Sequence, residues 1–246
     1  MAIKPHIYQE SDTLYRECAA RIVELALDTL AHQEHFHIAL AGGTTPRGLY
    51  QFLSRLGHEE FPHWERVRFY FGDERNVPPE HEESNFRMAR ESLFLPLQIK
   101  ESAIKRIKGE LPPEEAVPHY QEILEELPKE NDAPRFDLIL LGMGADGHVA
   151  SLFPGTPLLH ERQQVVGANF VEKLECRRYS LTLPVLNNAR HIILLVSGAK
   201  KADVIRHVFH GPDTAEPLPV QMLNHEKIEW FLDAEAARFL DTENEA

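Results

Sequence analysis

One stretch near the middle of the chain, residues 136–148, constrains the fold more than any other. It contains an apolar run, Leu138 to Leu141, which is typical of a strand buried on both faces of a sheet. Three glycines follow, Gly142, Gly144 and Gly147, and they free the backbone for a tight turn. A strand of this kind needs helices on both of its faces, so the stretch predicts an α/β fold.

The same turn carries the first candidate catalytic residues. It places Asp146 and His148 two positions apart at the carboxyl end of the strand. In open α/β sheets this end is where ligands bind. Histidine is the side chain best suited to move protons near neutral pH. We therefore interpret the turn as a catalytic loop, with His148 and Asp146 as its catalytic pair.

The rest of the chain alternates between strand-like and helix-like segments, which indicates βαβ units and a largely parallel sheet. We expect a single domain over residues 1–246, because there is no internal repeat and no low-complexity linker. The expected strands are 37–41, 67–71, 136–141, 180–183, 191–196 and 228–232. The expected helices are 12–31, one from Pro46 past Leu56, 83–93, 117–127, and one that includes Lys200 and Val204.

Composition limits the classes of partner. The 246 residues are 43% hydrophobic and 26% charged, as in ordinary globular proteins, and the net charge is −13. That charge argues against general affinity for nucleic acid or an anionic membrane. Two cysteines, no secretory signal at the start and no long apolar run favour a cytoplasmic protein. The oligomeric state is open, and we expect a monomer or a weak homodimer.

A second candidate loop follows the first expected strand. Gly42 and Gly43 let the backbone approach a ligand, and Pro46 fits the first helical position with Thr45 as the N-cap. Free N–H groups at such a helix start can bind an anion. With Thr44, these residues are candidate substrate contacts. The residues alone leave open whether the segment is only a good strand-to-helix turn.

A third candidate loop follows the expected strand 67–71. Asp73 and Glu74 can hold sugar hydroxyls or act as acid or base, and Arg75 can bind a phosphate or carboxylate through two hydrogen bonds. An isolated charge run is usually a solvated loop, but the position at a strand end favours function. Asn85 is a further candidate contact, although with Ser84 before it a helix-capping role also suffices.

Three familiar motifs are excluded. Gly43 and Gly48 have P-loop separation, but the required Lys and Ser/Thr are missing after them. Residues 142–147 match the dinucleotide pattern GxGxxG, but Pro154 and Pro157 interrupt the helix that this pattern needs. The fourteen histidines show no metal-ligand spacing, so no metal is expected.

The three loops together resemble 6-phosphogluconolactonase, in the glucosamine-6-phosphate isomerase/6-phosphogluconolactonase family. The resemblance rests on AGGTTP at 41–46, GDER at 72–75 with SN at 84–85, and GMGADGHVASLFPG at 142–155. It extends to RYSLT at 178–182 and GAKKA at 198–202, and it covers roughly residues 10–233 in the order of the family.

The resemblance implies a Rossmann-like α/β sandwich that hydrolyses 6-phosphogluconolactone in the oxidative pentose phosphate pathway without a cofactor. It implies that His148 activates water, that Asp146 orients the loop or the imidazole, and that the phosphate is bound by Arg75, Arg178 and Lys201. The sequence leaves some ambiguity between Lys200 and Lys201. Gly42, Gly43, Thr44, Thr45, Asp73, Glu74, Asn85, Gly142 and Gly144 are the other expected substrate contacts.

The main rival is glucosamine-6-phosphate deaminase, whose loop is similar but carries a glutamate five residues after the histidine. Here that position is Phe153. Deamination needs several proton transfers that a carboxylate can tune, and phenylalanine cannot relay protons. A sugar-phosphate sensor on the same fold is the other alternative, and it could dispense with Asp146 and His148. Lactone hydrolysis is therefore the predicted activity.

Overall fold

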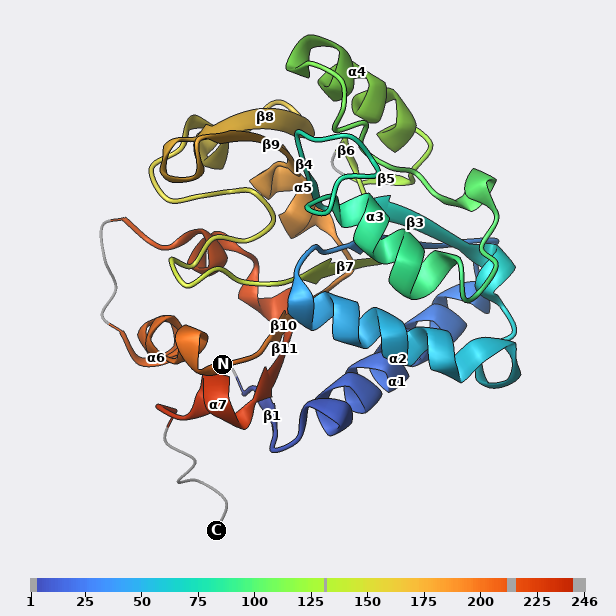
Figure 1. Cartoon of the computed structure of the whole chain (residues 1–246), viewed down its shortest axis with the longest axis horizontal. Coiled ribbons are helices and arrows are strands. Elements are labelled where there is room, and N and C mark those ends of the chain that lie inside the picture. The colour runs from blue at the N-terminus through green and yellow to red at the C-terminus, as the bar shows by residue number, and fades with distance from the viewer. Residues whose placement is uncertain (1–3, 131, 212–215, 241–246) are drawn as a thin grey trace.

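The computed structural model describes residues 4–130, 132–211 and 216–240. The domain expected over 1–246 thus includes short segments outside the described residues. A six-stranded sheet runs through the centre of the molecule (Figure 1). In spatial order its strands are β1 (His6–Tyr8), β11 (Ile228–Asp233), β10 (His191–Val196), β7 (Leu138–Leu141), β2 (Phe36–Leu40) and β3 (Val67–Phe71), and all neighbours are parallel.

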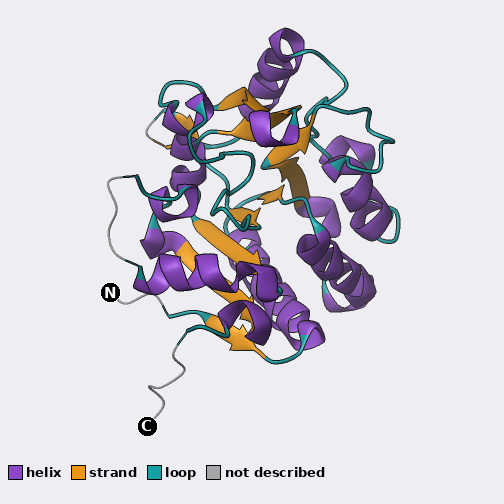
Figure 2. Ribbon diagram, turned by 60° about the vertical axis from the view of Figure 1, so that its left-hand side comes forward, coloured by secondary structure: helices purple, strands orange, loops and turns teal. Residues whose placement is uncertain are grey.

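Helices lie on both sides of this sheet (Figure 2), as the buried apolar strands require. They are α1 (Ser11–Leu30), α2 (Thr44–Glu60), α3 (Asn85–Ala89), α4 (Pro113–Leu124), α5 (Leu183–Asn188), α6 (Ala202–His210) and α7 (Ala234–Ala237). All four residues of β7 are buried, which confirms the doubly covered strand that its sequence predicts. The α/β class with a largely parallel sheet is confirmed.

A smaller antiparallel sheet, which the sequence analysis did not predict, stands beside the main one. Its strands are β4 (Asp73–Arg75), β9 (Cys176–Leu181) and β8 (Val166–Val171), in that spatial order. A two-stranded ribbon adds β5 (Lys129–Glu130) and β6 (Ala133–Pro134). The small sheet joins the loop after β3 to a segment a hundred residues later in the chain.

Several expected boundaries need correction. The strand expected at 180–183 is Cys176–Leu181, because Leu183 already begins α5 with a proline at its second position. The helix expected at 83–93 is the short α3 followed by one π-helical turn, Arg90–Phe94. The helix expected at 117–127 starts earlier, at Pro113, where proline suits the first turn.

No helix among the described residues is long and apolar enough to cross a membrane.

The strand order of the main sheet determines where a ligand site can form. From β2 the chain continues to β3 on one side, whereas β7, on the other side of β2, is followed outward by β10. The crevice between the carboxyl ends of β2 and β7 is therefore a topological switch point, where α/β proteins bind ligands.

Candidate active site

A cavity of about 300 Å³ lies at this switch point. It is lined by loops that follow β2, β3, β7 and β10, and by the small sheet. The predicted residues that line it are Gly42, Gly43, Thr44, Thr45, Asp73, Arg75, Gly142, Gly144, His148, Arg178 and Lys201. The structure thus brings the three sequence motifs together. Asp146, Glu74 and Asn85 are predicted site residues outside this lining.

Two buried tyrosines hold the strand ends that lead into the cavity. The Tyr50 hydroxyl donates to the Ala41 carbonyl (2.8 Å) and accepts from the Ala41 N–H (2.9 Å), directly before the Gly42 turn. The Tyr120 hydroxyl makes the same two hydrogen bonds with the backbone of Phe71, directly before Gly72: it donates to the carbonyl and accepts from the N–H, both at 2.9 Å. Each hydroxyl therefore satisfies both polar groups of one residue at the end of a strand.

The turn after β2 differs in one detail from the prediction. Helix α2 begins at Thr44 with Gly43 as N-cap, so Thr45 is not the cap and Pro46 is the third helical residue. Gly43 has a φ of 104°, a conformation that favours glycine, and the helix begins two residues earlier than predicted. The Thr45 hydroxyl lies 2.7 Å from that of Ser197, which connects the loops after β2 and β10.

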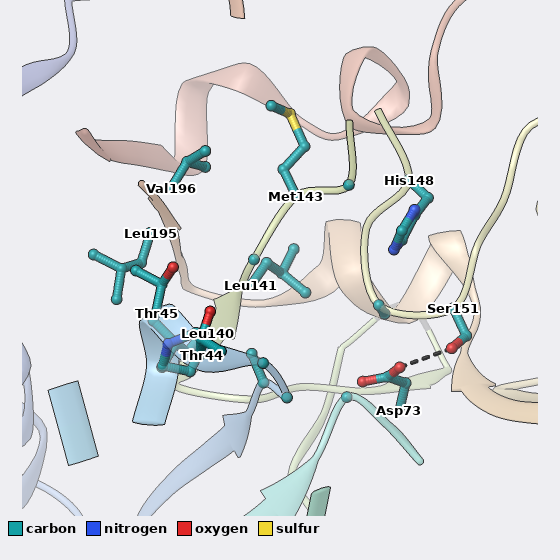
Figure 3. A pocket seen from close by; sticks show the side chains of 18 of the residues that line it. Thr44, Thr45, Asp73, Leu140, Leu141, Met143, His148, Ser151, Leu195 and Val196 are labelled. Carbon is teal, nitrogen blue, oxygen red and sulfur yellow. Dashed lines mark hydrogen bonds between the residues drawn. The ribbon is translucent and has the colours of Figure 1, made fainter. Parts of the chain in front are cut away.

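Asp73 presents a carboxylate to the cavity from the start of β4. The side-chain amide of Asn85 donates to it at 3.1 Å and the Ser151 hydroxyl donates at 2.7 Å. Figure 3 shows Asp73 and Ser151 on the same side of the cavity as His148, with Thr44 and Thr45 across from them. Two donors thus fix the carboxylate in place, and Asn85 acts from behind the cavity wall rather than in it.

Glu74 is buried behind the wall and holds α3 against β4. Its carboxylate accepts the backbone N–H groups of Arg75, Asn85 and Phe86, each at 2.8 Å, and the hydroxyl of Ser84 at 3.1 Å. Burial raises its pKa, and the three N–H donors oppose that rise. Ser84 also caps α3, as predicted, by accepting from the Arg87 N–H at 3.1 Å.

His148 projects from the loop after β7 into the cavity (Figure 3). Its Nδ1 lies 2.6 Å from Oδ1 of Asp146. An ionised carboxylate only accepts hydrogen bonds, so Nδ1 carries the hydrogen and Nε2 keeps a free lone pair. Both side chains pass directly over Gly144: an added Cβ there would lie 2.0 Å from Nδ1 and 2.4 Å from Oδ1 of Asp146.

The surroundings of His148 keep it neutral. Burial, together with the positive charges of Lys201, Arg178 and Arg75, lowers its pKa to about 4, and the carboxylate of Asp73 opposes this shift. The ring of Phe153 stacks on the imidazole with 4.0 Å between centroids and 29° between planes. One face of the imidazole is therefore covered by an apolar ring.

Three cations surround the empty part of the cavity. Arg75 on β4 and Arg178 on β9 are directly opposite cross-strand partners, and Lys201 precedes α6. Among the described residues none of the three forms an ion pair. Lys201 lines the cavity whereas the exposed Lys200 does not, which agrees with the choice of Lys201. Burial and the neighbouring Lys200 lower the Lys201 pKa. Like charges held together this way indicate an anion site.

Sequence reasoning missed three contributors. Ser151 belongs to the 142–155 motif, where its position three residues after His148 was the available signal. Ser197 follows β10 at its carboxyl end, which could have marked it as a loop residue of the site. Leu174, which lines the cavity at 46% exposure, carries no local signal because only the pairing of β8 with β9 brings it there.

Comparison with known proteins gives the family. The model of glucosamine-6-phosphate isomerases/6-phosphogluconolactonase matches residues 9–231. The 6-phosphogluconolactonase of Treponema pallidum is 39% identical over 220 residues, 88% of each chain, and that of Homo sapiens is 36% identical over 242 residues, 95% of this chain and 92% of the human one. The solved 6-phosphogluconolactonase of Trypanosoma cruzi has a TM-score of 0.83 at 30% identity, covering 98% of each chain. The resemblance carried by the three loops is confirmed, and the chain belongs to the family of glucosamine-6-phosphate isomerases and 6-phosphogluconolactonases.

Proposed function

We propose that this protein is a 6-phosphogluconolactonase, which hydrolyses 6-phosphoglucono-1,5-lactone to 6-phosphogluconate in the oxidative pentose phosphate pathway. The observation that carries the proposal is the environment of His148. Asp146 holds one ring nitrogen at 2.6 Å, and Phe153 covers one ring face where a deaminase-type loop carries a glutamate. This arrangement suits a histidine base that works without the loop carboxylate of a deaminase.

The first step is activation of water by His148. Because Nδ1 donates to Asp146, Nε2 is the basic nitrogen. It removes a proton from a water molecule while the water oxygen bonds to the lactone carbonyl carbon. Asp146 keeps the imidazole in the correct tautomer and stabilises the imidazolium that forms, as a third group does for other histidine bases.

The second step releases the ring oxygen. The tetrahedral adduct collapses, the bond between the carbonyl carbon and the ring oxygen breaks, and the imidazolium returns its proton to that oxygen. The product is an open-chain acid, which ionises and leaves the histidine neutral. Backbone N–H groups of the glycine turns stabilise the negative oxygen of the adduct. Asp73, fixed by Ser151, accepts a hydrogen bond from a sugar hydroxyl.

The phosphate is bound by Arg75, Arg178 and Lys201, with the first N–H groups of α2 beside them. These cations have no carboxylate partner among the described residues, so a phosphate dianion would supply the missing negative charge. The same cations lower the His148 pKa. Neutralising them raises the basicity of His148 only when substrate is present, which brings the base closer to its useful range.

The proposal is tested with three assays on the same protein. Freshly generated 6-phosphogluconolactone measures lactone turnover, glucosamine 6-phosphate with ammonia detection measures deamination, and calorimetry with 6-phosphogluconate measures binding. We expect rapid lactone turnover and no ammonia. Ammonia release would support the deaminase instead, and binding without turnover of either substrate would support the sensor.

The role of His148 is tested by His148→Ala. Removing a positioned general base reduces the rate by about 10²–10⁴-fold. We expect a loss of that order in kcat, with binding of 6-phosphogluconate retained because the phosphate contacts remain. The control is His160→Ala, which changes an exposed histidine outside the cavity lining. Turnover of His148→Ala close to that of the control, after subtraction of spontaneous hydrolysis, would contradict the assignment.

A further inference from the structure

Lys173 lies beside the catalytic loop, in the 3-10 turn Glu172–Leu174 that connects β8 to β9. Its ammonium group forms an ion pair with Oδ2 of Asp146. It also lies 4.7 Å from the centroid of the Phe153 ring, in cation–π contact. The side chain is 52% exposed and does not line the substrate cavity. Lys173 therefore contacts the loop from outside.

The two partners of Lys173 are the two groups that fix the imidazole. Asp146 uses Oδ1 for Nδ1 of His148 at 2.6 Å, and Phe153 stacks on the ring at 4.0 Å. Building on the function proposed above, we infer that Lys173 is a positioning residue for the reaction: it clamps Asp146 and Phe153 against His148 without touching substrate.

The clamp is needed because Asp146 has few other restraints. Among the described residues, its Oδ2 has Lys173 as its one polar partner, and Oδ1 is shared between Nδ1 and the backbone N–H of His148 at 3.3 Å. A carboxylate held on one oxygen can rotate, and rotation would release the imidazole tautomer. The ion pair fixes the second oxygen and removes that freedom.

Lys173 and Asp146 both border a second cavity. A hollow of about 410 Å³ is bounded by Asp146, Phe153, Phe170 and Lys173, so Phe153 has the substrate cavity on one side and this hollow on the other. Without the lysine side chain, water in the hollow takes the place of the ammonium group at Oδ2 of Asp146. A water-solvated carboxylate holds an imidazole less firmly than one fixed by a charge-assisted bond.

The charges around His148 predict that removal of Lys173 changes the pKa of the imidazole, which can be measured. Asp146 and Asp73 face it with negative charge, and Arg75, Arg178 and Lys201 face it with positive charge. Lys173 neutralises Asp146. Its removal leaves that carboxylate uncompensated, which favours the protonated imidazole and raises the His148 pKa. A purely structural loss would lower the amount of folded protein without changing this pKa.

The experiment compares Lys173→Met, Lys173→Arg and Lys129→Met, the last removing an exposed lysine that lines neither cavity. Each full-length variant is measured for kcat, KM and the pH dependence of kcat/KM, and the His148 imidazole is titrated by NMR without substrate. For Lys173→Met we expect kcat about 10-fold lower with KM nearly unchanged. We also expect the His148 titration and the acid limb to move up by ~0.5 pH unit or more.

Lys173→Arg keeps the charge and the ring contact, so its kcat and its His148 titration should be close to those of the wild type. Lys129→Met should match the wild type in both. Lys173→Met with wild-type kcat and titration would overturn the inference, and so would a loss confined to KM, which would mark a substrate contact. The NMR titration needs no turnover, so it separates the two proposals. A shifted His148 pKa in a protein without lactonase activity would refute the proposed function while retaining the coupling.

Discussion

Gly144 is the position where a single methyl group should most directly displace His148, the proposed catalytic base. A Cβ at Gly144 would lie 2.0 Å from Nδ1 and 2.3 Å from Cε1 of His148, where real Cβ contacts stay beyond 3.0 Å. The imidazole in Gly144→Ala must therefore move by at least 3.0 − 2.0 = 1.0 Å. Oδ1 of Asp146 must move as well, because the added Cβ would lie 2.4 Å from it, so the methyl group displaces both members of the pair.

A displacement of about 1 Å at a reacting group can reduce the rate by about 10²-fold. That factor corresponds to about 2.7 kcal/mol of lost transition-state stabilisation. We expect Gly144→Ala to lose about that much in kcat on freshly generated lactone. Affinity for 6-phosphogluconate, measured by calorimetry, should change little because the cations proposed to bind phosphate lie on other loops.

The matched control is Gly142→Ala in the same loop. An alanine Cβ there would meet only the carbonyl oxygen of Gly42, at 4.0 Å, so the imidazole keeps its place. The NMR signal of His148 should shift in Gly144→Ala and stay in place in Gly142→Ala. Full activity of Gly144→Ala together with an unmoved His148 signal would refute the reasoning, since it would mean that the loop absorbs the methyl group elsewhere.

Three further outcomes follow from the same geometry. Because burial lowers the His148 pKa to about 4, and neutral imidazole is the active form, its NMR titration in the free protein should have a midpoint near pH 4, with activity lost below it and kept above. Bound 6-phosphogluconate should move that midpoint upward, and a midpoint near 6.5 without ligand would contradict the burial argument. Arg178→Ala should weaken binding of 6-phosphogluconate in calorimetry by a factor equivalent to about 1.5–3 kcal/mol, the usual worth of a charged hydrogen bond, and unchanged affinity would exclude its phosphate role. Ser151→Ala removes the 2.7 Å donor to Asp73, so kcat/KM should fall while the melting temperature changes by only a few degrees; equal activity would show that Asn85 alone fixes Asp73.

Local signals made much of this fold predictable. The strand that ends at Leu141 and the glycine turn after it could be recognised locally, since an apolar run and a glycine-rich turn are each determined by a few neighbouring residues. The same holds for the strand before Asp73. Because parallel strands place their carboxyl ends at one edge, loops far apart in the sequence could be expected to meet.

The small antiparallel sheet could not be predicted in the same way. Its register pairs Arg75 with Arg178, and no short pattern specifies a partner a hundred residues away. In the same sheet, the pairing of β8 with β9 brings Leu174 and Lys173 to the site. Glu74 was expected to contact substrate, but its carboxylate is buried behind the cavity wall, where it accepts the N–H groups of Arg75 in β4 and of Asn85 and Phe86 in α3.

The paired hydrogen bonds of Tyr50 and Tyr120 have a consequence for ligand design. Each hydroxyl closes a small ring with one peptide residue, so the backbone at Ala41 and Phe71 cannot slide when a ligand arrives. A molecule that enters the cavity meets two rims already set to their final spacing, and little ordering entropy is lost there on binding. Rigid sugar-phosphate mimics that match the shape of this cavity should therefore bind without rearrangement of these two backbone segments. Flexible mimics lose conformational entropy of their own when they bind.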